Sequence, residues 1–142
     1  LALDRFGARF DVNAVAFLQL VQNLYPDPAA IPSDSRIIVS SSPAAYTPPA
    51  RFLGLAPSRV AQRVLAELLN ENLAEHGLRF SVFSIDGAID EPKMRAAFPK
   101  EPTSYFIQPD DIATSMAELL TGEAFPFRSG ISGESAFAGR GE

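Results

Sequence analysis

The strongest constraint on the fold is a long amphipathic segment that separates two short apolar runs. The segment from Ser58 to Glu75 repeats apolar residues at helical spacing, on a stripe formed by Val60, Val64, Leu65, Leu68, Leu69 and Leu73. The run from Arg36 to Ser40 is β-branched, and the run from Leu78 to Ile85 alternates and is rich in Phe and Val. Strand, helix and strand in this order predict two parallel neighbours joined by a crossover helix, and therefore an α/β fold.

Other segments fill in this outline. We predict a first helix from Asp11 to Leu24, a helical turn around residues 93–97, and a late helix that begins near Gln108 with an aspartate cap and ends at Gly122. His76 and Gly77 predict the end of the long helix, with the glycine as a left-handed cap. Residues 1–126 are expected to form one partial α/β domain, and residues 127–142 a flexible tail, because glycine, serine and arginine dominate there.

Composition narrows the possible partners. The chain has 142 residues, 46% of them hydrophobic, and a formal charge of −5, which argues for a folded protein and against nucleic acid as a partner. It has no cysteine and one histidine, so disulfides, thiolate catalysis and a metal site are not expected. No apolar run is long enough to span a membrane, and we expect a cytoplasmic protein.

Four stretches, at residues 11–13, 37–42, 81–89 and 108–113, together resemble the short-chain dehydrogenase/reductase family. Residues 11–13 (Asp-Val-Asn) resemble the segment that carries the family's catalytic asparagine, and residues 37–42 (Ile-Ile-Val-Ser-Ser-Ser) the strand that carries its active-site serine. Residues 81–89 resemble the strand and turn beneath the nicotinamide, and residues 108–113 the late helix. The resemblance implies a Rossmann-like parallel sheet with flanking helices.

The resemblance also assigns catalytic positions, and two of them depart from the family. It implies that Asn13 and Ser42 belong to the catalytic group. If Ser42 is the serine, Leu55 occupies the position of the catalytic tyrosine and Arg59 that of the lysine. Leucine has no proton to donate to a developing alkoxide, and arginine keeps the charge but does not titrate as a base. Activity is therefore expected to be impaired.

The cofactor site is expected to be incomplete. By resemblance, Asp86, Gly87 and Ile89 contact the nicotinamide side of NAD or NADP, but Glu91 replaces the family's threonine. The family's N-terminal half carries a glycine-rich turn for the pyrophosphate, and that half is absent from this chain. Residues 130–133 (Gly-Ile-Ser-Gly) are not followed by a helical pattern and are not interpreted as a phosphate loop. We expect the glycine-rich half on upstream sequence.

Simpler interpretations stay open beside these assignments. Asn13 at a helix start is also typical of a residue that caps the helix. Ser42 is typical of a side chain that hydrogen-bonds the backbone of a turn, and Arg59 of a side chain in a first helical turn that points to solvent. Tyr46 is a weaker candidate for a displaced acid. The chain is then a piece of an oxidoreductase with a small-molecule substrate, a non-catalytic relative, or an inactive truncated product. The two long helices predict a homo-oligomer through their apolar stripes.

Overall fold

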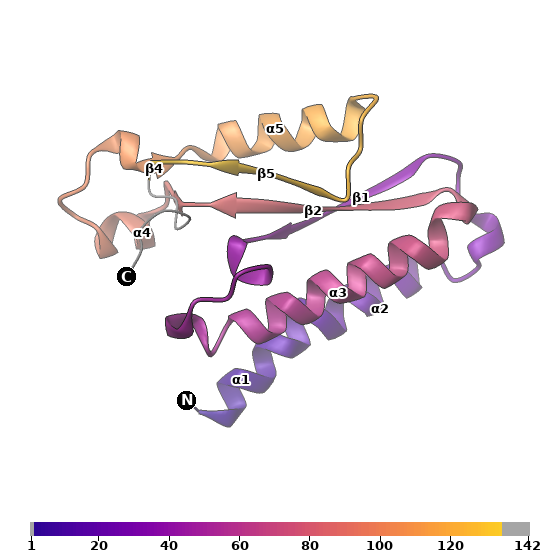
Figure 1. Cartoon of the computed structure of the whole chain (residues 1–142), viewed down its shortest axis with the longest axis horizontal. Coiled ribbons are helices and arrows are strands. Elements are labelled where there is room, and N and C mark those ends of the chain that lie inside the picture. Colours follow the sequence, from indigo (N-terminus) through magenta and orange to yellow (C-terminus); the bar gives the residue numbers. More distant parts are fainter. Residues whose placement is uncertain (1, 135–142) are drawn as a thin grey trace.

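The main sheet contains three parallel strands in the order β1-β2-β5 within residues 2–134, the part of the chain that the computed structural model describes. They are β1 (Ser35–Ser41), β2 (Leu78–Asp86) and β5 (Arg128–Ser132). Strand β1 pairs in parallel with residues 78–84 of β2, as predicted, and Val82 to Asp86 of β2 pair with β5. Helices cover both faces of the sheet (Figure 1), so the α/β fold with a parallel sheet is confirmed.

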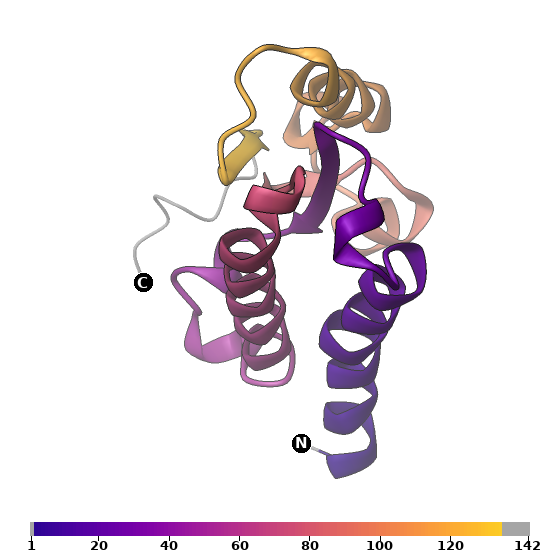
Figure 2. The same cartoon turned by 90° about the vertical axis from the view of Figure 1, so that its right-hand side faces the viewer.

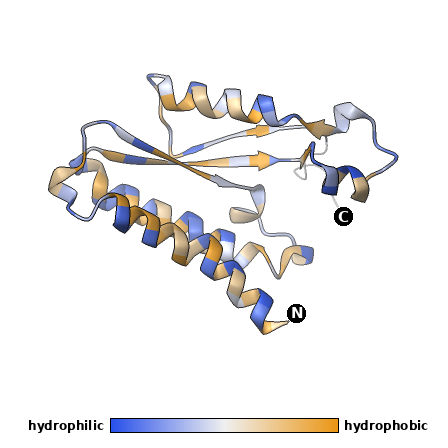
Figure 3. Cartoon of the chain, turned by 180° about the vertical axis from the view of Figure 1, so that it is seen from behind, coloured by the Kyte–Doolittle hydropathy of each residue, from blue (hydrophilic) through white to orange (hydrophobic). Residues whose placement is uncertain are grey.

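The central strand explains why both faces need helices. Leu78, Phe80 and Val82 of β2 are buried in a cluster with α2 (Ala16–Leu24) and α3 (Ala56–Leu73). Phe83 belongs to a second cluster with α5 (Pro109–Thr121) on the opposite face. A strand that is buried on both faces carries apolar side chains on both of them. This strand was predicted from the alternation between Leu78 and Ile85 and from its Phe and Val residues. Figure 2 shows the helical layers on either side of the sheet, and Figure 3 the hydrophobic residues on the central strands.

The N-terminal helix begins earlier than predicted and contains a π-helical turn. It runs as α1 (Leu3–Phe10), a π turn (Asp11–Val15) and α2, so the predicted start at Asp11 is wrong. The π turn contains about one residue more than an α-helical turn. The apolar residues of α2 are therefore out of phase with the residues that precede the π turn. No residue of α1 is buried, and this part of the helix therefore gave no core pattern to follow.

The remaining elements show two further differences from prediction. Gly77 has φ +92°, which confirms the left-handed cap, and the helical turn is α4 (Pro92–Ala97). The prediction of an aspartate cap on α5 is wrong, because Gln108 is the N-cap residue. The aspartates lie in the first helical turn, where their negative charges interact favourably with the helix dipole. Two short strands were not predicted, β3 (Ala88–Ile89) and β4 (Phe106–Ile107), which pair in parallel.

The prediction of a flexible tail from residue 127 onward is wrong for residues 128–132, because these residues form strand β5. Phe125 is buried, and Phe127 packs on the cluster that contains Phe80. With Ile131, these residues alternate along the chain, a strand pattern that the glycine and serines obscured. Residues 135–142 lie outside the described part of the chain. None of the helices in residues 2–134 is long and apolar enough to cross a membrane.

Candidate functional site

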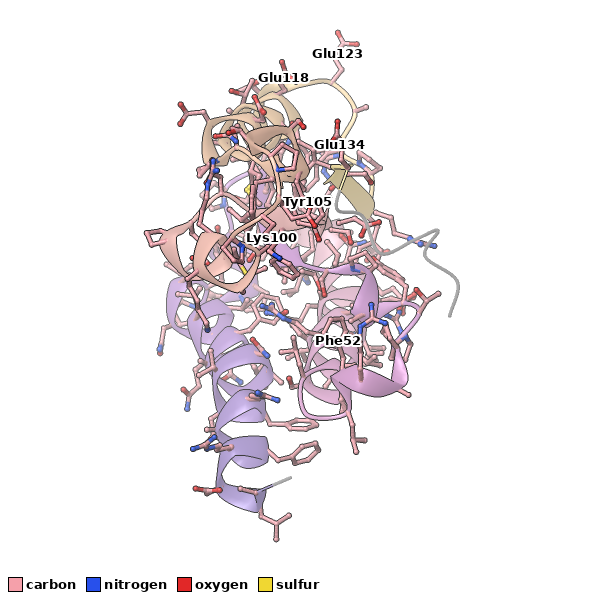
Figure 4. All side chains as sticks on the ribbon, turned by 90° about the vertical axis from the view of Figure 1, so that its left-hand side faces the viewer. Phe52, Lys100, Tyr105, Glu118, Glu123 and Glu134 are labelled. Carbon is pink, nitrogen blue, oxygen red and sulfur yellow. The ribbon has the colours of Figure 1, made fainter. Side chains whose placement is uncertain are left out.

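The predicted serine lines a pocket at the carboxyl ends of β1 and β2, where ligands of open α/β sheets bind. Ser42 follows β1 directly in extended conformation, and Pro43 then starts a 3₁₀ turn. The pocket has a volume of about 220 Å³, and its walls are formed by Ser42, Pro43, Ala44, Thr47, Pro49, Phe52, Leu55, Ile85 and Gly87. We call it the Ser42 pocket. Phe52, labelled in Figure 4, lies on the opposite side of the sheet from Glu118 on α5.

Within residues 2–134, the walls of the Ser42 pocket are mostly apolar and include no ionisable side chain. The hydroxyls of Ser42 and Thr47 are its polar side-chain groups, and Leu55 stands at the position where the family resemblance implies the tyrosine. The leucine immediately precedes α3 and its side chain caps nothing. The pocket can therefore donate hydrogen bonds from hydroxyls to a substrate oxygen, but the described part of the chain places no group in it that could protonate an alkoxide at neutral pH.

Asn13 lies behind the Ser42 pocket and reaches it through two hydrogen bonds. It is buried in the π turn, and its Nδ2 donates to Oγ of Ser58 at 2.9 Å. The Ser58 hydroxyl donates in turn to the carbonyl oxygen of Leu55 at 2.9 Å. Single π turns within α-helices are frequent at functional sites. Asn13 thus fixes the backbone at the pocket wall and does not line the pocket.

Arg59 is also directed away from the Ser42 pocket. Its Nη1 donates to the carbonyl oxygen of Ser40 at 3.0 Å and to Oε1 of Gln62 at 2.9 Å. Burial lowers the pKa of Arg59 below its ordinary value, but a guanidinium remains charged at neutral pH. This residue ties the start of α3 to the end of β1, next to the pocket.

The three residues predicted to contact a nicotinamide do not converge on one place. Gly87 lines the Ser42 pocket and has φ +153°, a backbone conformation that favours glycine. Asp86 is buried and lines a neighbouring pocket instead. Ile89 pairs with Ile107 and packs on the cluster beneath α5. Of the predicted site residues, only Ser42 and Gly87 share the pocket.

A second pocket of about 310 Å³ adjoins the first, with Pro43 and Thr47 in both walls. Its other walls consist of Tyr46, Ser84, Asp86, Arg128, Ser129, Gly130, Ile131 and Ser132. We call it the Tyr46 pocket. The guanidinium carbon of Arg128 lies 4.1 Å from the centre of the Tyr46 ring, and that of Arg63 lies 5.4 Å from it.

The Tyr46 pocket is the more polar of the two and was missed from the sequence. Burial raises the pKa of Tyr46, and the positive charges of Arg128 and Arg63 act in the opposite direction. Arg128 was assigned to the tail, so nothing in the pattern linked it to a tyrosine 82 positions earlier. The alternation of Phe125, Phe127 and Ile131 was the one signal that could have placed it in a strand.

The fold is that of known short-chain oxidoreductases, although sequence comparison alone identifies no relative. No family model and no curated protein matches the sequence. Among solved structures, an NADPH-bound short-chain oxidoreductase from Pseudomonas aeruginosa with an atypical catalytic center superposes with a TM-score of 0.76 at 15% identity, over 93% of this chain and 57% of that one. This likeness shows the fold and not the activity.

Two further structures give the same result. Acetoin dehydrogenase YohF from Salmonella typhimurium matches with a TM-score of 0.74 at 20% identity, over 95% of this chain and 56% of that one. A short-chain dehydrogenase from Burkholderia cenocepacia in complex with NADP matches with a TM-score of 0.71 at 20% identity, over 92% and 51%. The chain therefore has the short-chain dehydrogenase/reductase fold, and it spans slightly more than half the length of these proteins.

Proposed function

We propose that this chain forms the substrate side of an NAD(P)-dependent short-chain oxidoreductase of low catalytic power. The observation that carries the proposal is the Ser42 pocket, where a serine hydroxyl, an open apolar wall and Gly87 meet at the carboxyl ends of parallel strands. A bound dinucleotide would supply the hydride, and Ile85 and Gly87 would hold its nicotinamide side. The solved structures of this fold with NADPH or NADP support that cofactor class.

The chain's own residues would bind and orient the substrate in this reaction. The Ser42 hydroxyl would donate a hydrogen bond to the carbonyl oxygen, and Phe52, Leu55 and Ile85 would exclude water from the reacting carbon. Asn13 and Ser58 would hold the Leu55 carbonyl and so keep the wall in place. Because no tyrosine is among the described residues that line this pocket, the proton would come from solvent, and the rate would be low.

The glycine-rich half that binds the pyrophosphate would have to come from outside the described residues, on the same chain or on a partner. Among the described strands, β1 pairs only with β2, so its other edge is open for a further parallel strand. A groove of about 280 Å³ lies beside that edge, with walls of Val12, Ala16, Phe17, Leu20, Ile38, Val39, Ser40 and Gln62. Such a strand and its helix would complete the sheet.

The direct test is oxidation of NADPH or NADH by the protein in the presence of small ketones and aldehydes. We expect slow, saturable turnover that falls at least tenfold in Ser42→Ala, because one positioned hydrogen bond to the developing oxyanion is lost. Ser33→Ala is the matched control, since Ser33 is exposed before β1 and lies outside both the Ser42 pocket and the groove. Equal rates in the two variants, or binding of neither dinucleotide, would contradict the proposal.

A non-catalytic binding or oligomerisation role is the second candidate, and two observations favour it. Leu55 cannot donate a proton, and Arg59 is occupied by Ser40 and Gln62. The helical layer also exposes large apolar side chains that a second copy would bury, namely Val12, Val15, Leu20 and Leu24 on the N-terminal helix and Val64 and Leu68 on α3. We propose a homo-oligomer through these two helices.

The oligomer is tested by light scattering after size-exclusion chromatography. Replacing Leu20 and Leu68 by glutamate places charges on both exposed stripes, and we expect the assembly to dissociate into monomers. Leu120→Glu, on α5 and of similar exposure, is the control that leaves the assembly intact. A monomeric wild-type protein would contradict this part of the proposal.

A further inference from the structure

Two arginines of α3 hold the backbone on either side of Ser42. Nη1 of Arg59 donates to the carbonyl oxygen of Ser40 at 3.0 Å, two residues before the serine. Nε of Arg63 donates to the carbonyl oxygen of Ala45 at 3.0 Å, three residues after it. Because residues four positions apart lie on the same face of a helix, a single face of α3 bonds both flanks of the serine.

The two guanidinium groups are also fixed on their own helix. Arg59 donates to Oε1 of Gln62 at 2.9 Å, and Nη1 of Arg63 donates to Oε2 of Glu67 at 3.0 Å. The guanidinium carbon of Arg63 also lies 5.4 Å from the centre of the Tyr46 ring. A planar guanidinium that is held in this way loses little freedom for each further hydrogen bond. Arg63 therefore presents a preorganised donor to the turn after β1.

The bond from Arg63 reaches Ser42 through the 3₁₀ turn Pro43–Ala45. The amide of Ala45 donates to the carbonyl oxygen of Ser42 at 3.0 Å, and the carbonyl oxygen of Ala45 accepts the bond from Arg63. Ala44 and Ala45 are only 2% and 1% exposed, and their small side chains let the turn pack against α3. A displacement of Ala45 would therefore move the backbone that carries the Ser42 hydroxyl.

We propose that Arg63 is a positioning residue for the Ser42 hydroxyl and that it acts together with Arg59. This role rests on the proposed function, in which Ser42 donates a hydrogen bond to the substrate oxygen. Arg63 is not among the described residues that line the Ser42 pocket or the Tyr46 pocket, so it acts through the backbone and not by contact with the substrate. A misplacement of about 1 Å in a reacting group can reduce the rate on the order of 10²-fold, so an indirect contact of this kind has a measurable effect.

The kinetic test is carbonyl reduction with NADPH by Arg63→Gln, in the wild-type and in the Ser42→Ala background. In the wild-type background we expect kcat to fall at least about fivefold, while the Kd of NADPH changes by less than about twofold. In the Ser42→Ala background we expect the same change to lower kcat by less than about twofold, because the hydroxyl that Arg63 positions is absent. A fall of equal size in both backgrounds would overturn the proposal, since it would show a general effect on the fold.

Arg63→Lys separates the hydrogen bond from the charge. Lysine keeps the positive charge but replaces the planar fork with a single ammonium group, and we expect it to lower kcat as far as glutamine does. Full activity in Arg63→Lys would overturn the proposal, because the charge alone would then suffice. Arg79→Gln is the matched control, because Arg79 also pairs with a carboxylate, that of Asp34, and lies over an aromatic ring, that of Phe125. It lies near the opposite end of the paired strands from Ser42, and we expect this variant to leave kcat unchanged.

A measurement without substrate or cofactor keeps this test apart from that of the proposed function. NMR spectra of the isotope-labelled protein report the amide and Cβ chemical shifts of Ser42 and the hydrogen-exchange rate of the Ala45 amide. We expect Arg63→Gln to shift the Ser42 signals and to speed exchange at Ala45 at least about fivefold, and Arg79→Gln to change neither. Unchanged Ser42 signals in Arg63→Gln would overturn the proposal. The expected shifts in a protein without turnover would support the positioning of Ser42 and contradict the proposed function.

Discussion

The two adjoining pockets share the kinds of side chain that an oxidoreductase of this fold would be expected to hold in a single pocket. The Ser42 pocket occupies the place where substrate and nicotinamide are expected to meet by family resemblance, yet the described residues of its walls carry hydroxyls and apolar side chains and no ionisable group. The Tyr46 pocket holds a tyrosine, an arginine and an aspartate, but on the other face of β2. The chemistry of a site is thus set by the face of the strand on which each side chain lies, and not by proximity in sequence.

The largest effect is expected from placing the missing acid in the Ser42 pocket. The double change Leu55→Tyr and Arg59→Lys would restore the residue types that the family resemblance implies, and general acid catalysis contributes about 10²- to 10⁴-fold in rate. We expect carbonyl reduction by the protein with bound NADPH to rise within that range, measured as cofactor oxidation. Leu53→Tyr with the same Arg59 change is the control, because Leu53 is exposed and outside the pocket. Equal rates would show that the pocket is not the reaction site.

A smaller effect, on stability, is expected at the floor of the Tyr46 pocket. Gly130→Ala would force a Cβ against the Ser84 carbonyl and separate β5 from β2, and we expect about 3 kcal/mol of destabilisation. Chemical denaturation measures it. Gly7→Ala is the control, since its Cβ would meet nothing within 4 Å and alanine is favoured in a helix by about 1 kcal/mol. A Gly130 variant as stable as wild type would contradict the close approach of the two strands.

The next prediction concerns the support behind the Ser42 pocket. Asn13→Ala removes the donor to Ser58 and leaves a buried hydroxyl without that partner, at a cost of about 2 kcal/mol in unfolding free energy. Asn23→Ala, at an exposed position of the same helix, should change stability by less than about 0.5 kcal/mol. If the two variants are equally stable, Asn13 does not hold the pocket wall through Ser58.

The smallest effect is expected from the pH dependence of Tyr46. Because burial raises its folded-state pKa above the unfolded value of about 10, the neutral phenol stabilises the folded protein below pH 10, and this stability is lost as the pH rises through the folded pKa. Subtracting the phenolate absorbance of Tyr46→Phe from that of wild type isolates this ionisation. A midpoint below pH 10 would mean that the nearby arginines outweigh burial.

Local sequence pattern was sufficient for the central part of the fold but not for the N-terminal helix start, for strand β5 or for the second pocket. Strands β1 and β2 and helices α3 and α5 were predictable, because each buries apolar residues with its own period. The start of the N-terminal helix was not, because α1 buries nothing. Strand β5 was missed because only Ile131 and its phenylalanine neighbours mark it, and its pairing with β2 is a contact between distant segments.

The sequence by itself determined the α/β class, the parallel pairing of β1 with β2, and the position of Ser42 at a strand end, since these depend on periodicity within short windows. Only the tertiary structure decided that Asn13 acts through Ser58, that Arg59 is bonded to Ser40, and that Asp86 lies apart from Gly87. It also brought Arg128 onto the ring of Tyr46. The physical reason is that side-chain hydrogen bonds and stacking depend on the three-dimensional register of strands and helices, which no local pattern encodes.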